Sequence, residues 1–275
     1  MSSSPPSVAD KRATFRQLHQ SGCFLLPNPW DLGSARYLQS LGFKALATTS
    51  SGFAWSIARA DGAPSRDAVL AHLRDLSTAS EVPVNADFQG GFAHEPDRIA
   101  QSVRLAVDTG IAGLSIEDST GDAAQPLYDL DSAVARLRAA RRAIDQTGMD
   151  VLLVGRAECF LVGRPDIEET MTRLQAYASA GADCLYAPGI SSREHIAAVV
   201  AAVAPKPVNL LVSRAGALTV AQIAELGVRR ISVGGALARV AWGAFMRAAQ
   251  LMLEQGRFDG LADAASGQAL DALFA

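Results

Sequence analysis

The feature that most constrains the fold is an alternation, repeated eight times, of a short apolar run with a longer segment of helical periodicity. Each apolar run is typical of a strand that is buried on both faces of a parallel sheet. Several helical segments end in a glycine followed by an apolar residue, as at Gly42 and Gly181, which indicates a helix terminus that turns into the next strand. The predicted strands span residues 24–27, 45–49, 83–87, 113–117, 151–156, 184–187, 207–212 and 230–233.

Eight such units favour a closed (β/α)8 barrel, the TIM-type α/β fold, over an open doubly wound sheet of eight strands, which is the alternative. No glycine-rich dinucleotide fingerprint follows the first predicted strand, where the sequence reads NPWD, and this disfavours a Rossmann fold. We predict a single domain over residues 1–275, with a disordered tail at 1–10. A C-terminal helix at 236–256 is expected to pack on the barrel or to be exchanged with a partner subunit.

Composition excludes several classes of protein. Hydrophobic residues make up 49% and charged residues 19%, which excludes a disordered chain. The formal net charge of −3 argues against a nucleic-acid partner, and no apolar run reaches the ~18 residues of a membrane span. The three cysteines (Cys23, Cys159 and Cys184) form no close pair, which indicates a reducing compartment. Because no leader of basic and apolar residues opens the chain, we expect a cytoplasmic protein.

Polar residues gather at the predicted carboxyl ends of the strands, where barrels of this type carry their active sites. Asn85 and Asp87 face the same side of one strand, and Glu117 ends the next. Hard oxygen ligands of this kind suit Mg²⁺ or Mn²⁺. Arg156 offers a planar fork for a carboxylate, and Glu158 shares its face. A cation and an arginine together would hold a 2-oxo acid and stabilise an enolate.

Further candidates stand on the later strands. Tyr186 is a candidate catalytic acid, Asn209 a candidate substrate ligand, and His94 an alternative base. Gly234 precedes the last helix in a segment like the phosphate site common in barrels, which supports a competing interpretation as a sugar-phosphate aldolase or isomerase. Against this alternative, no lysine ends a strand to form a Schiff base. The strand-end carboxylates could also serve only as caps of the following helices.

Four segments carry a resemblance to a known family. The opening segment PNPWDLGSARYLQSLGFKALATTSSGFAWS is followed in order by VNADFQGGFA, GLSIEDS and VGRAECF. Over about residues 20–250 this series resembles the isocitrate lyase / phosphoenolpyruvate mutase superfamily. The resemblance implies a (β/α)8 barrel, Mg²⁺, and a 2-oxo acid or enolpyruvate-type substrate in which a C–C or C–P bond is made or broken. It also implies a homodimer or homotetramer that exchanges its last helix.

The resemblance implies a metal site around Asp87, which matches the second Asp of the family's metal motif. Glu117 matches the glutamate that holds metal-bound water, and Asp61 matches a further acidic residue near the metal. The first position of the motif is Asn85 instead of aspartate. Because an amide oxygen brings no charge, we expect it to bind Mg²⁺ more weakly or through water.

The resemblance also implies how a small carboxylate substrate is bound. Arg156 matches the substrate arginine, and Glu158 its neighbouring carboxylate. Ser51, Gly52 and Phe53 match the loop whose backbone amides and hydroxyl hold the substrate carboxylate.

The segment 119–128 departs from the family, because it lacks both the Cys-Gly-His of the lyases and the Lys-Thr-Asn-Ser of the mutases. The favoured function is a Mg²⁺-dependent lyase that cleaves a C–C bond of a small 2-oxo or 2-hydroxy carboxylate through an enolate. Decarboxylation of an oxaloacetate-like acid requires least of this segment, because loss of CO₂ needs no general base. The alternatives are a C–P mutase or hydrolase acting on phosphoenolpyruvate or phosphonopyruvate, and a carboxylate-binding barrel with little catalytic activity.

Overall fold

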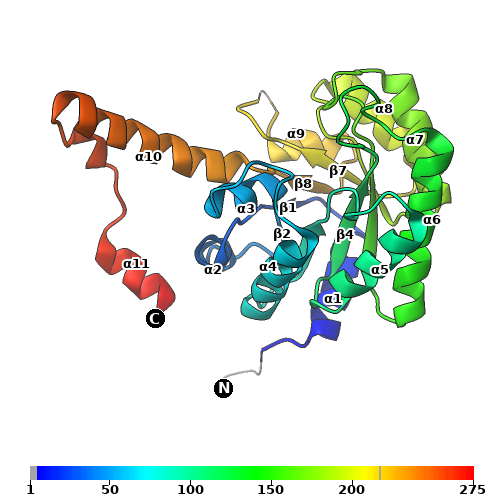
Figure 1. The fold of residues 1–275 in the computed structure, drawn as a ribbon, viewed down its shortest axis with the longest axis horizontal. Helices are drawn as coiled ribbons and strands as arrows, with labels where there is room; N and C mark the ends of the chain where they lie inside the picture. The colour runs from blue at the N-terminus through cyan, green and yellow to red at the C-terminus, as the bar shows by residue number, and fades with distance from the viewer. Residues whose placement is uncertain (1–4, 217) are drawn as a thin grey trace.

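Eight parallel strands form the centre of the computed structural model, which describes residues 5–216 and 218–275 (Figure 1). Their hydrogen-bonded order is β1-β8-β7-β6-β5-β4-β3-β2. Between the two end strands, β1 and β2, the Ala47 amide donates to the Pro27 carbonyl at 3.0 Å. The sheet is a nearly closed (β/α)8 barrel, which confirms the predicted fold class. The strands are β1 (Phe24–Leu26), β2 (Leu46–Ala47), β3 (Val84–Asp87), β4 (Gly113–Glu117), β5 (Leu152–Arg156), β6 (Cys184–Tyr186), β7 (Val208–Leu211) and β8 (Arg230–Ser232).

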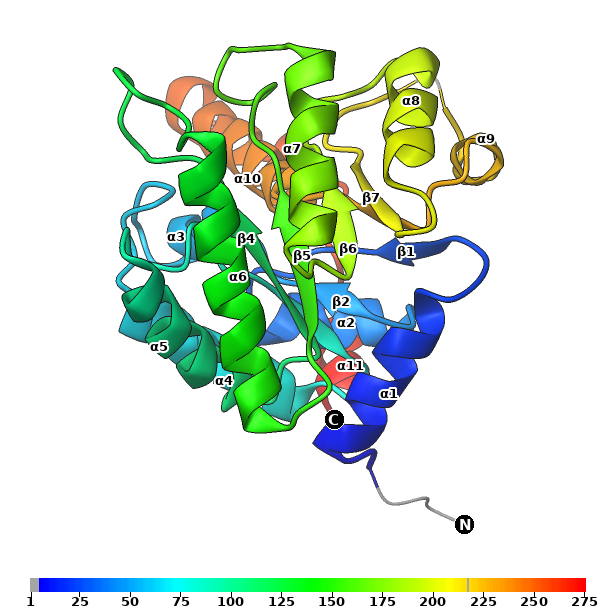
Figure 2. The same ribbon diagram turned by 90° about the vertical axis from the view of Figure 1, so that its right-hand side faces the viewer.

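Helices alternate with the strands and cover the outside of the barrel (Figure 2). Side chains that suit helix N-termini begin them, for example Asp31 and Asp129. Gly42 and Gly181 follow two of the helices with φ of 87° and 104°, which side chains other than glycine rarely adopt. The helices are α1 (Val8–Leu18), α2 (Leu32–Ser40), α3 (Ser50–Ser56), α4 (Arg66–Ala79), α5 (Pro96–Val107), α6 (Leu130–Thr147), α7 (Ile167–Ser179), α8 (Arg193–Val203), α9 (Val220–Glu225), α10 (Ala236–Gln255), the 3₁₀ turn η1 (Asp259–Leu261) and α11 (Gly267–Phe274).

The N-terminal helix α1 closes the end of the barrel at which the strands begin. Its Phe15 is fully buried and packs against Leu26, Ala112 and Leu152. The opposite end, where the strands finish, is left for a binding site. The helix begins at Val8 because Ser7 caps it reciprocally with Asp10. Residues 8–10, expected in a disordered tail, are therefore its first turn, and residues 1–4 of that tail lie outside the described residues.

The C-terminal helix α10 extends away from the barrel as an arm that ends in α11 (Figure 1). It covers nearly all of the predicted segment 236–256. Ala238 is its one buried residue, whereas Val240, Phe245 and Leu253 are 70%, 62% and 87% exposed. Most of the apolar surface of this arm is therefore not covered by its own barrel.

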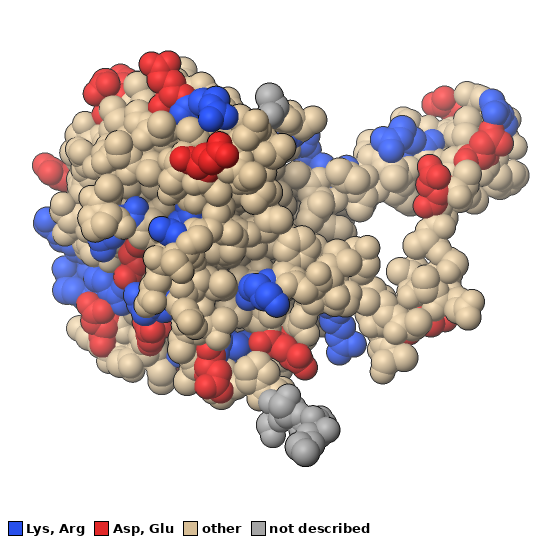
Figure 3. All heavy atoms as spheres, turned by 180° about the vertical axis from the view of Figure 1, so that it is seen from behind, with Lys and Arg blue, Asp and Glu red and all other residues tan. Residues whose placement is uncertain are grey.

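The back of the barrel carries interspersed basic and acidic side chains (Figure 3). Over residues 5–216 and 218–275, no helix combines the length and the apolarity needed to cross a membrane.

Candidate active site

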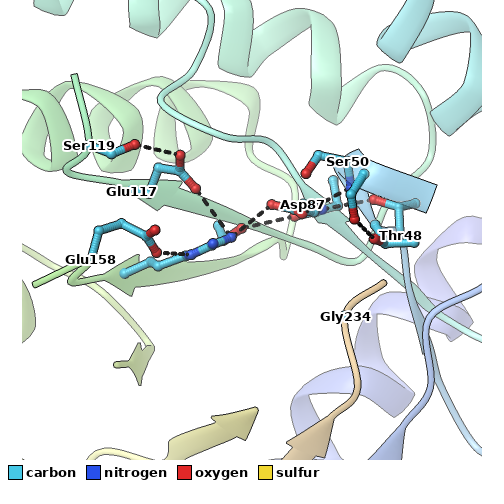
Figure 4. Close-up of polar contacts among 12 residues, drawn as sticks. Thr48, Ser50, Asp87, Glu117, Ser119, Glu158 and Gly234 are labelled. Atoms are coloured by element: carbon cyan, nitrogen blue, oxygen red, sulfur yellow. Dashed lines mark hydrogen bonds and ion pairs between the residues drawn. The ribbon is translucent and has the colours of Figure 1, made fainter. Parts of the chain in front are cut away.

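Arg156, which ends β5, is held by carboxylates from three strand ends. These carboxylates, Asp87, Glu117 and Glu158, are labelled in Figure 4. Nη1 of Arg156 lies 3.1 Å from Asp87 Oδ1 and 3.2 Å from Glu117 Oε2, while its Nε donates to Glu158 Oε1. The guanidinium carbon lies 5.2 Å from the centre of the Tyr186 ring. Among residues 5–216 and 218–275, no group accepts a hydrogen bond from Nη2 of this arginine. The guanidinium is therefore fixed in orientation with one NH₂ group available to a ligand.

Burial and mutual repulsion raise the proton affinity of this cluster. Burial raises the pKa of Glu158 to about 7 and also raises the pKa of Glu117, in both cases against the opposing effect of Arg156. Burial alone would lower the pKa of Arg156, but the three carboxylates raise it well above its usual value. One guanidinium faces three carboxylates, so a buried excess of negative charge has to be offset by a proton or a bound cation.

A Glu158→Gln variant tests this charge imbalance. Between its ordinary pKa of 4.5 and about 7, Glu158 holds a proton in the folded chain that the unfolded chain releases. Its contribution to the free energy of unfolding is therefore complete below pH 4.5 and is lost as pH rises through about 7. From about pH 5 to about pH 8, we expect the wild type to lose on the order of 2 kcal/mol of stability relative to the variant, measured by urea unfolding without added metal.

The matched control for that measurement is Glu168→Gln, which removes an exposed carboxylate at the start of α7. It should follow the wild type at every pH. If the Glu158→Gln and wild-type stabilities change in parallel with pH, Glu158 does not hold the extra proton.

The oxygen donors around Asp87 suit a hard divalent cation. Asp87 Oδ2 accepts the Ser50 amide at 3.1 Å, and Asp61 lines the same cavity from the exposed turn before α4. Within the described ranges, no three His, Cys, Asp or Glu side chains form a ready-made metal cage. A cation here would take one or two carboxylates and complete its shell with water, which is the usual manner of Mg²⁺. The residues present therefore fit Mg²⁺, with Asp87 as the central donor.

Asn85 lies one layer deeper in the barrel than Asp87 and belongs to a buried polar network. Arg230 Nη1 donates to Asn85 Oδ1 at 3.3 Å, and its Nε donates to Asn209 Oδ1 at 2.9 Å. The amide of Asn209 donates in turn to Ser232 Oγ at 3.0 Å. Asn85 and Asn209, predicted to bind metal and substrate, both line the cavity but are engaged with Arg230. Arg230 was not predicted as a site residue, because an arginine at the start of a strand does not by itself indicate a function.

Above this network lies a cavity of about 190 Å³, and the predicted anion loop forms one of its walls. That loop is the first turn of α3, because Thr49 caps the helix. The Gly52 amide donates to Thr49 Oγ1 at 3.3 Å, and the Phe53 amide donates to the Thr49 carbonyl at 3.1 Å. Ser51 lines the cavity, but the Phe53 ring stacks on His72 at 4.0 Å outside it. The amides of Gly52 and Phe53 are thus bonded to Thr49, and their role in holding a substrate carboxylate stays a prediction.

Gly234 also lines this cavity, in the segment before α10 (Figure 4). Its amide and that of Val233 both donate to Asn28 Oδ1, at 2.8 and 2.9 Å. These amides are thus occupied by Asn28, and the predicted contact of Gly234 with substrate would need its carbonyl or its Cα.

A second cavity of about 550 Å³ lies on the other side of Arg156, with Glu117 and Glu158 in its wall. His94, the alternative base, also lines it and is hydrogen-bonded through Nδ1 to the Tyr128 hydroxyl. Arg136 holds the preceding loop by donating to three of its backbone carbonyls. Arg136 is itself buried, although it lies on a helix of the outer layer.

Asp118 holds the backbone of Glu158 in place through a hydrogen bond. Its Oδ1 accepts the backbone amide of Glu158 at 2.8 Å, and its Oδ2 accepts Arg173 Nη1 at 3.1 Å and the Tyr177 hydroxyl at 2.5 Å. This contact fixes the backbone from which Glu158 projects. Arg173 and Tyr177 lie four positions apart on one helix, but no pattern in the sequence connected them with Asp118.

Comparison with known proteins shows to which family the chain belongs. The model of the phosphoenolpyruvate phosphomutase family matches residues 15–253, a range that includes the whole carboxylate cluster. The chain belongs to this family. This match confirms the resemblance to the PEP mutase/isocitrate lyase superfamily, and the chain is an enzyme of that superfamily, whose members are C–C lyases or mutases.

Three relatives illustrate the range of this family. A protein of Burkholderia cenocepacia with the provisional name lyase/mutase is 46% identical, with a TM-score of 0.94 and 97% of each chain covered. The solved 2,3-dimethylmalate lyase, a superfamily member, is 29% identical with a TM-score of 0.84, over 98% of this chain and 95% of that one. Oxaloacetate decarboxylase of Paraburkholderia xenovorans is 29% identical over 70% of this chain and 66% of its own length.

Proposed function

We propose that this protein is a Mg²⁺-dependent lyase that cleaves a C–C bond of a small 2-oxo or 2-hydroxy carboxylate through an enolate. The simplest such reaction is decarboxylation of an oxaloacetate-like acid. The observation that carries the proposal is Arg156, which three carboxylates fix in orientation and whose Nη2 is left for a ligand. The adjoining cavity of about 190 Å³ is below the range of drug-sized ligand pockets and suits a small acid.

In the proposed mechanism, Arg156 binds one carboxylate of the substrate through Nη2 and keeps it in place while the C–C bond breaks. Tyr186 packs on the guanidinium, and burial raises the pKa of its phenol to about 12, so it stays a neutral hydrogen-bond donor. A divalent cation bound at Asp87 would supply Lewis-acid stabilisation of negative charge on the 2-oxo oxygen. Glu158, whose pKa burial raises to about 7, lies in the wall of the second cavity, so it would return a proton to the enolate carbon through a bridging water near neutral pH.

The segment 119–128 favours decarboxylation over the other reactions of the family. It forms a short hairpin-like loop, in which Ser119 bridges to Leu127, and it contains no Cys, Lys or His. Retro-aldol cleavage requires a base to remove the hydroxyl proton, whereas loss of CO₂ does not. Oxaloacetate decarboxylase and 2,3-dimethylmalate lyase among the relatives support lyase chemistry on acids of this size.

The test is a panel of candidate substrates assayed with purified protein and Mg²⁺ for release of pyruvate. It includes oxaloacetate, 2,3-dimethylmalate, 2-methylisocitrate and phosphonopyruvate. We expect oxaloacetate-like acids to react well above the rate that Mg²⁺ alone produces. Release from phosphonopyruvate alone would instead support C–P chemistry. No turnover of any member by protein that binds Mg²⁺ and oxalate would overturn the proposal in favour of a binding role.

We also propose that the protein is a homodimer or homotetramer in which a second copy covers α10. The exposed apolar residues Val240, Phe245 and Leu253 support this, because a patch of this kind on a soluble domain marks an interface. A Phe245→Glu variant is expected to dissociate into monomers, as measured by light scattering at micromolar concentration. The control Gln250→Glu adds the same charge to the same helix and should keep the assembly. A wild type that is monomeric would contradict the proposal.

A further inference from the structure

We propose that the substrate of this enzyme carries an apolar substituent, which binds in a separate chamber beside β7. The inference rests on the proposed function and narrows its substrate class. The chamber has a volume of about 470 Å³ and is lined by residues of β7, α8 and α9. Figure 2 shows how these three elements are arranged. It is more than twice as large as the 190 Å³ cavity beside Arg156.

One side of the chamber is hydrophobic and rigidly supported. Ile190, Ile196, Leu210 and Ile223 line it, and each of these side chains is only 1–3% exposed. They come from four elements or loops that belong to the main core of the barrel. A surface of this kind gains free energy by taking apolar groups out of water and offers little to a charged ligand.

The chamber adjoins the active-site cavity, which makes it accessible to part of a bound substrate. Leu161 and Leu211 line both spaces. Leu211 ends β7, two residues after Asn209, and Leu161 is a half-exposed residue in the turn after Glu158. A ligand whose carboxylate is bound to Arg156 can therefore extend its other end past these two leucines.

The polar residues of the chamber suggest the main alternative to an apolar substituent, which is a chain with an anionic end. Ser191, Ser213 and Arg214 also line it, so a chain with an anionic end could be drawn toward Arg214. The number of buried aliphatic side chains favours an alkyl or aryl group over a second carboxylate. Binding of ligands that carry an alkyl or a carboxyalkyl substituent on the same core distinguishes the two possibilities.

The first measurement is calorimetric binding of N-alkyl oxamates in the presence of Mg²⁺, from methyl to hexyl. Their planar NH–CO–COO⁻ core resembles the enolate of a 2-oxo acid, and turnover is not required. We expect affinity to rise about fourfold for each added methylene, until the chamber is filled. An equal affinity for all lengths would overturn the inference. Tighter binding of a carboxypentyl oxamate than of the hexyl compound would also overturn it.

Variants of Ser213 place the binding in this chamber. Ser213 lines the chamber but not the cavities beside Arg156. We expect Ser213→Phe to fill the chamber and abolish the dependence on chain length, while affinity for oxamate itself is kept. The control Ser213→Ala should behave as the wild type. Thermal unfolding checks that Ser213→Phe is folded, and the wild-type series decides the question if it is not.

The two proposals fail in different ways. If oxamate binds and oxaloacetate is turned over but chain length has no effect, the proposed function stands and the chamber is not part of the substrate site. If neither oxamate binding nor turnover of any panel member is observed, the proposed function itself is wrong.

Discussion

Replacement of Arg156 by lysine is expected to lower kcat/KM for the best substrate of the panel by about 10²- to 10³-fold, although the charge is kept. Arg156 binds three carboxylates with its planar guanidinium and still has one NH₂ group for a ligand. The compact ammonium group of a lysine cannot make all of these contacts at once. The loss should appear in both KM and kcat, because the same group binds the ground state and stabilises charge as the bond breaks. Steady-state kinetics with saturating Mg²⁺ measures the effect.

Arg104→Lys is the matched control, since Arg104 is an exposed residue of α5 outside both cavities. Its kinetics should equal those of the wild type. Equal activity of Arg156→Lys and wild type would remove the central observation of the proposed function, because it would show that the free NH₂ group binds nothing in the reaction.

Replacement of Asp87 by asparagine is expected to weaken Mg²⁺ binding by about 10- to 100-fold and to lower activity to a similar extent. The substitution keeps the size of the side chain, so its contacts with the Ser50 amide and with Arg156 are the only ones altered. The charge of the donor is lost, as it already is at Asn85. Calorimetric titration with Mg²⁺ and with Mn²⁺ measures binding without reference to turnover.

Asp75→Asn provides the control, because Asp75 is an exposed carboxylate on α4 and should not affect metal affinity. An unchanged affinity in Asp87→Asn would move the predicted metal away from β3. The second cavity, where Glu117 and Glu158 lie together, would then be the place to look for it.

The fold was predictable because its signal is local and repeated. Each predicted strand contains an observed one, and glycines such as Gly42 end helices where the pattern indicated. The boundaries were less accurate. The strand predicted over 45–49 is reduced to Leu46–Ala47, because Thr49 leaves the sheet to cap α3. Capping is decided by the geometry of the turn, and composition alone does not reveal it.

The site was predictable only where short spacing carried the information. The positions of Asp87, Glu117 and Arg156 at strand ends were enough to bring these side chains together in a barrel. The buried Arg136 and Arg230 were missed, because an arginine that donates to partners far away in the sequence looks like any surface arginine. Burial of such a residue depends on tertiary contacts, and these have no local pattern.

The junction between β1 and β2 is also part of the wall of the active-site cavity. Seven neighbouring strand pairs are joined by regular ladders. At the eighth junction Asn28 acts as a clasp, with its Nδ2 on the Thr48 carbonyl at 2.8 Å and its Oδ1 on the amides before α10. Asn28 also lines the 190 Å³ cavity, so a ligand bound there would contact the side chain that, together with the Ala47–Pro27 hydrogen bond, joins β1 to β2. Ligand binding is therefore expected to slow local opening of this junction.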